Sequence, residues 1–339
     1  MKMLINGKWV DKPEKINVVN PYDDTLVDTV PAGTADDVEK AIESAVEGFI
    51  INRDLPVHRR ISILKKTSEI MESRFDELAK TIATEGSKTI KEARKEVERA
   101  INTITISAEE ARRLNGETIP FDSAEGSENR VGYYYRFPIG VIAAITPFND
   151  PLNLVAHKLG PAIAGGNSVV LKPAQSASLS LLQLARLAME AGIPKGVLNV
   201  VTGSGSVVGE ALGVHPDVDV LAFTGSGVVG RRLLNYAAQS NLKRVHLELG
   251  GKSPNIVFAD APDIEAAVAT AINGIFRNSG QVCTAGSRLL VQETIYEEFL
   301  EKVISGAEQL VVGDPLDPAT DIGAVHTLDQ LKNKMNSKN

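Results

Sequence analysis

Residues 140–171, GVIAAITPFNDPLNLVAHKLGPAIAGGNSVVL, decide the fold of this chain. The apolar run Gly140–Ile145 is followed by a helical stretch at Pro151–Ala164 and by a second β-branched run at Ser168–Leu171. Two short apolar runs on either side of a helical segment are typical of a strand–helix–strand unit with two parallel strands. The stretch therefore predicts part of a parallel β-sheet.

The same alternation continues downstream. Further β-branched runs lie at Val197–Val201, Val218–Phe223 and Val245–Leu247, and helical stretches lie at Ser178–Ala191, Ser206–Leu212 and Val228–Ser240. This order predicts a doubly wound α/β fold, with helices covering both faces of the sheet. A strand at Asn255–Phe258 and a helix from Pro262 to Arg277 begin a second α/β unit.

The segment before the sheet has a different pattern. Residues 3–10 and 17–31 alternate in polarity and are interrupted by turn residues, which predicts a short strand pair. Apolar residues then recur at helical spacing, which predicts three amphipathic helices at 35–52, 57–87 and 89–115. Residues 130–136 resemble an exposed aromatic strand.

Composition excludes several classes of protein. The chain has 339 residues, 43% of them hydrophobic and 23% charged, which is ordinary for a globular protein with two cores. A formal net charge of -7 argues against nucleic-acid or anionic-membrane partners, and no apolar run approaches membrane-spanning length. The single cysteine excludes an internal disulfide framework. We therefore expect a cytoplasmic protein without a membrane partner.

Four strand-to-helix junctions carry polar or glycine-rich sequence. They are Thr146–Asn149, Leu171–Gln175, Thr202–Gly205 and Phe223–Gly230, the last of which matches G-x-G-x-x-G. Each alone could be a tight turn with no ligand. Parallel strands end at a common edge of the sheet, and ligands of such sheets bind at that edge. Four junctions of this kind therefore favour a ligand site.

The chemically most distinctive residue is Cys283. A solitary cysteine is often a small buried apolar residue, but Gly280 and Gln281 before it and Thr284 and Gly286 after it indicate a loop, which favours a reactive thiol. Glu248, followed by Leu249-Gly250-Gly251, is either a surface ion-pair partner or a base for that thiol's chemistry.

These motifs together resemble the aldehyde dehydrogenase superfamily. The motifs are Thr146-Pro147-Phe148-Asn149, Lys172-Pro173, Phe223-Thr224-Gly225-Ser226, Glu248-Leu249-Gly250-Gly251-Lys252 and Gly280-Gln281-Val282-Cys283, and the resemblance extends to Gly313-Asp314-Pro315. It implies an NAD(P)-binding domain with a Rossmann-type sheet at 1–126 and 139–248. It also implies a bridging or oligomerisation strand at 127–138 and a catalytic domain at 249–339.

The resemblance implies a catalytic role for three residues. Cys283 attacks the aldehyde to give a thiohemiacetal, hydride passes to the nicotinamide, and water hydrolyses the resulting thioester. The side chain of Asn149 and the backbone N–H of Cys283 stabilise the oxyanion. Glu248 in a partly desolvated site serves as the general base. A carboxylate at 248 favours release of a free acid over transfer to coenzyme A.

The resemblance also implies the cofactor contacts. Lys172 contacts the adenine ribose, Gly225 and Ser226 contact the pyrophosphate, and Phe148 and Leu249 line the nicotinamide side. The other expected cofactor residues are Thr146, Pro147, Gln175, Gly205, Phe223, Val229 and Gly230. Gln175 stands where NAD-preferring relatives carry Glu, and a neutral amide does not repel a 2′-phosphate, which favours NADP or the use of both NADP and NAD.

The substrate is less well defined. Asp150 suggests a polar pocket, and Arg277 stands where succinate-semialdehyde dehydrogenases place an arginine for the substrate carboxylate, with His157 in place of a second arginine. Arg277 could equally satisfy carbonyls at a helix C-terminus. Val282 and Thr284 flank the nucleophile. We expect a small hydroxylated or anionic aldehyde, such as lactaldehyde, glyceraldehyde or succinate semialdehyde, and no metal ion.

The chain departs from the family at its end. After Gly313-Asp314-Pro315 the family continues with a Glu-x-Phe-Gly-Pro motif and a late strand of the oligomer, which are absent here. We therefore expect a truncated member that binds nucleotide better than it turns over aldehyde, whose full-length relatives form homo-oligomers. The alternative is a catalytically silent nucleotide-binding remnant. A classical alcohol or hydroxy-acid dehydrogenase is disfavoured, because its fingerprint would lie near the first strand.

Overall fold

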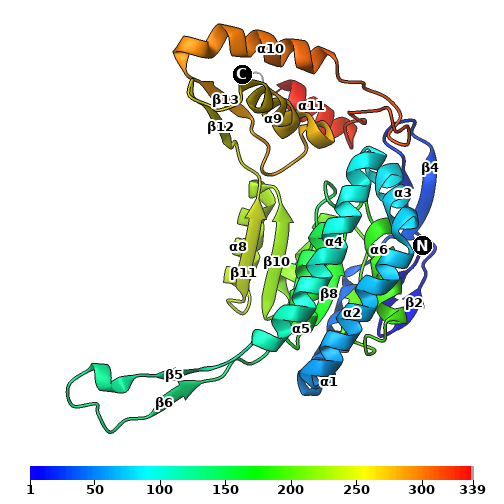
Figure 1. Ribbon diagram of the computed structural model, residues 1–339. Helices are drawn as coiled ribbons and strands as arrows, with labels where there is room; N and C mark the ends of the chain where they lie inside the picture. Colours follow the sequence, from blue (N-terminus) through cyan, green and yellow to red (C-terminus); the bar gives the residue numbers. More distant parts are fainter. Residues whose placement is uncertain (337–339) are drawn as a thin grey trace.

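The computed structural model describes residues 1–336, and its centre is a seven-stranded sheet of order β11-β10-β7-β8-β9-β1-β2 (Figure 1). Five neighbouring strands of this sheet are parallel: Arg244–Leu249 (β11), Val220–Gly225 (β10), Val141–Ile145 (β7), Ser168–Lys172 (β8) and Leu198–Val200 (β9). The hairpin of Met3–Ile5 (β1) and Lys8–Val10 (β2) adds to β9 in antiparallel orientation. The predicted α/β fold is confirmed.

Helices cover both faces of this sheet. Alternate residues of β8 show the arrangement, because Val169 and Leu171 belong to one apolar core and Val170 to the other. The first core involves Val57–Ser73 (α2), Phe75–Gly86 (α3), Ile90–Glu110 (α4), Asn153–Ala164 (α5) and Leu179–Glu190 (α6). The second involves Ala35–Asp54 (α1), Glu210–Val214 (α7) and Gly227–Gln239 (α8). Burial on both faces explains the β-branched strand runs.

The N-terminal segment differs from expectation in two places. Instead of one strand pair there are two hairpins, since Lys15–Val19 (β3) and Leu26–Pro31 (β4) pair with each other in a separate sheet. The expected helix at 57–87 is two helices, because Arg74 between α2 and α3 has φ -114° and ψ 21°. Both helices are nevertheless amphipathic as expected, because Ile61 of α2 and Leu78 and Ile82 of α3 all lie in the first core.

A two-stranded arm projects from the body of the molecule (Figure 1). Glu117–Ile119 (β5) pairs antiparallel with Gly132–Tyr134 (β6), which confirms the exposed aromatic strand. Tyr133, Tyr135 and Phe137 are exposed on it. Since β5 precedes residue 127, the arm takes in residues that the sequence assigned to the first domain.

A second, smaller unit follows the main sheet. Pro254–Val257 (β12) and Arg288–Val291 (β13) form a parallel pair, and Ile264–Phe276 (α9), Tyr296–Glu308 (α10) and Leu328–Asn336 (α11) complete it. Its buried core consists of Val257, Val268, Ala271 and Phe299.

Five short helical segments complete the structure. They are Ala111–Arg113 (η1), Phe121–Ser123 (η2), Gly205–Gly209 (η3), Arg277–Gly280 (η4) and Glu293–Ile295 (η5). The helix expected at 206–212 is therefore a π turn, η3, that runs into the short α7. Within residues 1–336, none of the helices has the length and apolar character that a membrane crossing requires.

Candidate active site

The loops that follow the parallel strands meet at one edge of the main sheet. The backbone N–H of Thr146, directly after β7, donates to the carbonyl of Lys172 at the end of β8, 3.0 Å away. The expected fingerprint at 225–230 also lies between a strand and a helix, because β10 ends at Gly225 and α8 begins at Gly227. All four junctions singled out in the sequence therefore lie at the carboxyl ends of parallel strands.

The loop that carries Cys283 has an unusual backbone. Asn278, Ser279 and Gly280 have φ values of 50°, 55° and 71°, which is the left-handed region that only Gly, and to a lesser extent Asn, adopts readily. Cys283 follows this turn and is exposed, as the loop prediction requires. The turn needs support from its neighbours, because left-handed non-glycine residues are strained.

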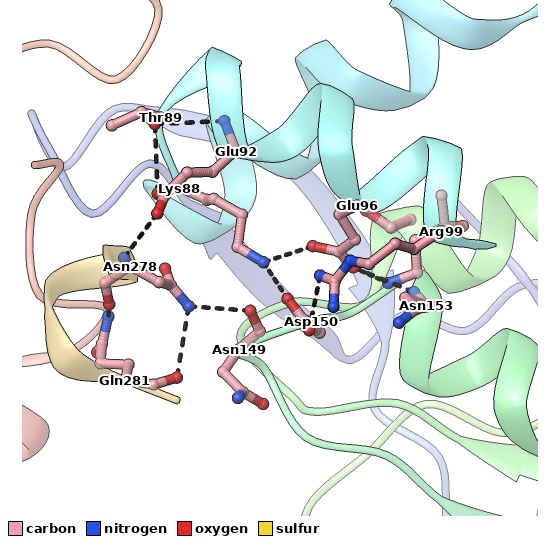
Figure 2. Close-up of polar contacts among 12 residues, drawn as sticks. Lys88, Thr89, Glu92, Glu96, Arg99, Asn149, Asp150, Asn153, Asn278 and Gln281 are labelled. Carbon is pink, nitrogen blue, oxygen red and sulfur yellow. Dashed lines mark hydrogen bonds and ion pairs between the residues drawn. The ribbon is translucent and has the colours of Figure 1, made fainter. Parts of the chain in front are cut away.

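Asn278 supplies much of that support (Figure 2). Its backbone N–H donates to Glu92 Oε1 on α4 at 2.9 Å, and its Nδ2 donates to the carbonyl of Asn149 at 3.0 Å and to that of Gln281 at 3.4 Å. One side chain thus connects the nucleophile loop to the loop that carries the proposed oxyanion donor. Asn149 itself is half-buried, and its side-chain amide points away from Asp150 (Figure 2).

Glu248 lies near the end of β11, opposite Thr224 of β10. Because β11 is the edge strand of the sheet, the carboxylate is exposed, which differs from the partly desolvated site expected from the sequence. The loop after it approaches Cys283, since a Cβ on Gly251 would lie 4.0 Å from the carbonyl oxygen of that residue. The segments of Cys283, Asn149 and Glu248 are therefore brought to one region of the molecule.

Lys158 on α5 is a site residue that the sequence analysis missed. Its Nζ donates to Thr224 Oγ1 at 2.9 Å. Burial lowers the pKa of Lys158 to about 8, against an opposing attraction from Glu248. The available signal was a lysine, next to His157, between the apolar residues 154–156 and 159–164. Such a lysine is often only a helix-surface residue.

A buried ion cluster supports the loop that carries Asn149 (Figure 2). Lys88 forms ion pairs with Glu96, at 2.6 Å, and with Asp150, and Arg99 binds the other oxygen of Asp150 at 3.0 Å. Burial raises the pKa of Glu96 despite the opposing charge of Lys88. Burial acts to raise the pKa of Asp150 too, but Lys88 and Arg99 hold it below its ordinary value.

The same cluster orients α5. Glu96 Oε1 accepts hydrogen bonds from the backbone N–H groups of Leu152 and Asn153, at 2.9 and 3.1 Å, and so caps the first turn of that helix. Asp150 was expected to indicate a polar substrate pocket. In the structure its carboxylate is instead committed to two cations, because Lys88 is buried beside it.

Asp150 and Arg277 line one cavity of about 400 Å³, together with Arg99 and Lys95. Arg277 directly follows α9. His157, which stands in place of a second arginine, lines different cavities from Arg277, one of them with Lys158 and His246. Val282 is half-buried and Thr284 is exposed on either side of Cys283.

The expected cofactor residues lie at or just beyond the carboxyl ends of the five parallel strands, β7 to β11. Lys172 is buried, its Nζ donates to the carbonyl of Pro173 at 3.0 Å, and burial lowers its pKa to about 8. Among residues 1–336 it forms no ion pair with a carboxylate. Gly209 lies beside the lysine stem, since a Cβ there would be at an ordinary contact distance of 3.9 Å from Lys172 Cδ and Cε. A buried ammonium group of this kind fits the oxygen atoms of a nucleotide ribose or phosphate.

Helix α8 supplies the second part of that site. Ser226 accepts a hydrogen bond from the N–H of Val229 at 3.4 Å, and Ser226 and Val229 are both exposed at the first turn. The positive end of a 13-residue helix favours a pyrophosphate. Gly205 begins η3 and is exposed, and Gln175 is exposed after β8. Phe223 and Gly230 are buried, and Leu249 is exposed at the end of β11.

Comparison with known proteins identifies related chains. The model of the aldehyde dehydrogenase family matches residues 9–337. A 3-sulfolactaldehyde dehydrogenase from Priestia aryabhattai is 45% identical over 330 residues, covering 97% of this chain and 68% of the relative. The NADP/NAD-dependent aldehyde dehydrogenase PuuC from Escherichia coli is 42% identical, covering 96% of this chain and 66% of that protein.

Solved structures agree. The crystal structure of a putative aldehyde dehydrogenase from Burkholderia cenocepacia superimposes with a TM-score of 0.95 at 37% identity, covering 99% of this chain and 68% of that chain. The chain thus spans about two thirds of the length of such proteins.

Proposed function

The chain belongs to the aldehyde dehydrogenase family, and from this premise we propose that it oxidises a small polar aldehyde to the free carboxylic acid with Cys283 as the nucleophile. The cofactor of such enzymes is NAD or NADP. The observation that carries the proposal is the Asn278 bridge, which joins the loop of Cys283 to the loop of Asn149.

In the first step, the thiolate of Cys283 bonds to the carbonyl carbon of the aldehyde. The carbonyl oxygen gains a negative charge, and the side-chain amide of Asn149 and the backbone N–H of Cys283 donate hydrogen bonds to it. One such donor is worth about a hundredfold or more in rate. The bound nicotinamide cofactor supplies the electron acceptor for the oxidation to the thioester.

In the second step, water releases the acid. Glu248 accepts a proton from the water as its oxygen bonds to the acyl carbon, and the sulfur of Cys283 leaves as thiolate. Lys158 binds Thr224, which lies opposite Glu248 in the sheet, and its ammonium group attracts the negative charge of Glu248. The exposed position of Glu248 on β11 gives water direct access to it.

Two features support the substrate class. The cavity that Arg277 lines has a small excess of cations, because Lys88, Lys95, Arg99 and Arg277 face three carboxylates, Glu92, Glu98 and Asp150. A relative that is 45% identical is named for 3-sulfolactaldehyde, a small hydroxylated anion. We infer a short aldehyde with a hydroxyl or anionic substituent, with Arg277 as the principal cation, because Arg99 is already paired with Asp150.

The cofactor preference follows from Gln175. Its side chain is exposed after β8, near buried Lys172, and carries no negative charge. A 2′-phosphate on the adenine ribose therefore meets an ammonium group and no repelling carboxylate. We infer that the chain accepts NADP at least as well as NAD.

Rapid-mixing measurement of NAD(P)H formation tests the proposal. The wild-type chain should give a burst with lactaldehyde or glyceraldehyde, followed by steady turnover. Glu248→Gln should keep the burst but lose the steady phase by about a hundredfold or more, because only deacylation needs the base. Cys283→Ala should abolish both phases. A Cys283→Ala chain with an undiminished burst would contradict the proposal, and a wild-type chain with no burst and an inert thiol would support the silent remnant.

A panel of aldehydes tests the role of Arg277. Arg277→Met should raise KM for an anionic aldehyde by about tenfold or more and leave neutral propionaldehyde within about twofold. Arg112→Met serves as the matched control, because Arg112 is exposed on η1 and lines none of the cavities described above. Equal effects of Arg277→Met on both aldehydes would contradict an anion contact.

A further inference from the structure

We propose that His326 is a positioning residue, which fixes the ring of Phe148 against the loop that carries Cys283. The inference rests on the proposed function for its catalytic consequence, but the geometry stands independently. His326 lies in the loop before α11, far in sequence from both partners, and is 4% exposed. No motif in the sequence marked it.

The imidazole ring of His326 lies flat on Phe148. The ring centroids are 4.4 Å apart and the planes differ by 2°. Phe148 immediately precedes Asn149, so the orientation of the Phe148 ring and the placement of the Asn149 amide depend on one short loop. The stack therefore acts on the side of the site where the oxyanion and the nicotinamide are expected.

Two hydrogen bonds hold His326 in place. Its Nε2 lies 2.7 Å from Ser176 Oγ, next to Gln175 in the loop after β8. Its backbone N–H donates to Gln281 Oε1 at 3.0 Å, and Gln281 is two residues before Cys283. His326 therefore contacts the oxyanion loop, the cofactor loop and the nucleophile loop at once.

The backbone around His326 is anchored separately. The N–H of Ala324 donates to Ser87 Oγ at 2.9 Å, and Ser279 Oγ donates to the carbonyl of Gly323 at 2.8 Å. A side chain at 323 is not tolerated without movement, because a Cβ there would lie 1.9 Å from the carbonyl oxygen of Ser87. The position of His326 is thus set by the fold, and the imidazole transmits that position to Phe148.

The ring acts as a neutral group. Burial lowers the pKa of His326 to about 4, so it carries no charge at neutral pH. A neutral imidazole can stack on Phe148 and form one hydrogen bond with Ser176, and no charge is then buried. What His326 contributes is therefore placement of its neighbours.

The test compares three variants, two at His326 and one at Ser176. His326→Leu keeps the volume and removes both the stack and the Nε2 hydrogen bond. His326→Phe keeps an aromatic ring against Phe148, and Ser176→Ala removes only the hydrogen-bond partner. His58→Leu is the matched control, because His58 is an exposed histidine on α2.

Three readouts are measured: the rate of Cys283 alkylation by iodoacetamide, the rate of the NAD(P)H burst, and the Kd of NADP from calorimetry. His326→Leu should slow the burst by about tenfold and change the alkylation rate by about threefold or more, because small misplacements of reacting groups have large kinetic effects. His326→Phe should recover most of the burst, and Ser176→Ala should lie between. The Kd should stay within about twofold, since Lys172 and α8 provide the expected nucleotide contacts.

Two results would overturn the inference. One is a His326→Leu chain whose alkylation and burst rates match those of wild type and His58→Leu. The other is a loss of burst or alkylation rate that disappears when each variant is assayed at a temperature equally far below its own Tm. That result would indicate an effect on stability only. Alkylation does not require turnover, so it decides the role of His326 even if the wild-type chain shows no burst.

Discussion

The main sheet unit, residues 1–249, and the smaller unit, residues 254–336, are stabilised in different ways. The first has an extensive apolar core on each face of its sheet. The second buries a small cluster around Phe299 between a two-stranded sheet and helices α9 and α10. Asn149 and Lys158 belong to the first unit, whereas Cys283 belongs to the second.

This difference explains why so many polar contacts join the two units. The nucleophile loop is tied to α4 by the Asn278–Glu92 hydrogen bond, and the segment beyond α10 is tied to it by the Lys91–Asp321 ion pair at 2.8 Å and by the Ile90 N–H, which donates to Pro315 at 2.7 Å. A small core cannot fix a catalytic loop by itself. The large unit therefore serves as the frame against which the thiol is placed.

The largest change in stability is expected at the buried ion cluster of the main unit. Lys88→Met leaves the carboxylates of Glu96 and Asp150 buried without their shared cation, so the free energy of unfolding should fall by about 3–5 kcal/mol. Urea denaturation measures it. Lys40→Met is the control, because the exposed pair Lys40–Asp36 should give no measurable change. Equal effects of the two variants would show that the cluster does not support the frame.

A somewhat smaller and more local effect is expected in the second unit. Phe299 is fully buried there, and Phe299→Ala should destabilise the unit by about 3 kcal/mol through lost burial and the cavity left behind. Hydrogen exchange should quicken in α9, α10 and β12 but not in β7 or β8. Uniform quickening across both units would mean that they unfold as one body, and the contrast drawn above would fail.

The smallest effect is a pH dependence at the boundary of the site. The pKa of Lys158 is lowered from 10.5 to about 8 in the folded chain, so the unfolded chain binds more protons between these values and stability rises with pH there. Between pH 8 and 10 the unfolding free energy of the wild type should gain about 1–2 kcal/mol relative to Lys158→Met. A difference that stays constant over this range would place Lys158 in a solvated position.

Most of the fold could be predicted because buried parallel strands consist of short runs that are rich in β-branched residues. The break at Arg74 could not, since apolar residues continue at helical spacing from Ile70 to Leu78 and neither Gly nor Pro marks the boundary. The helix ends there because Arg74 leaves helical dihedral angles. Hydrophobic spacing reports the buried face and is insensitive to one residue outside the helix.

Part of the site was also predictable. The motifs around Asn149, Glu248 and Cys283 identified the family, which the matching family model confirms, while the roles of these residues stay predictions. Lys158 and His326 were missed because their environment depends on neighbours distant in sequence, Thr224 for the lysine and Phe148 for the histidine. For Asp150 the residue type indicated polarity, but only the fold reveals that Lys88 lies beside it.

The projecting arm has a consequence for which substitutions the fold tolerates. Two strands of three residues each are too few to stay ordered in water by their own contacts. Tyr133 and Tyr135 on this arm are exposed, so the hairpin buries little apolar surface against the main sheet unit. Substitutions in β5 and β6 should therefore leave the stability of the main sheet almost unchanged, because neither strand contributes a residue to its two apolar cores.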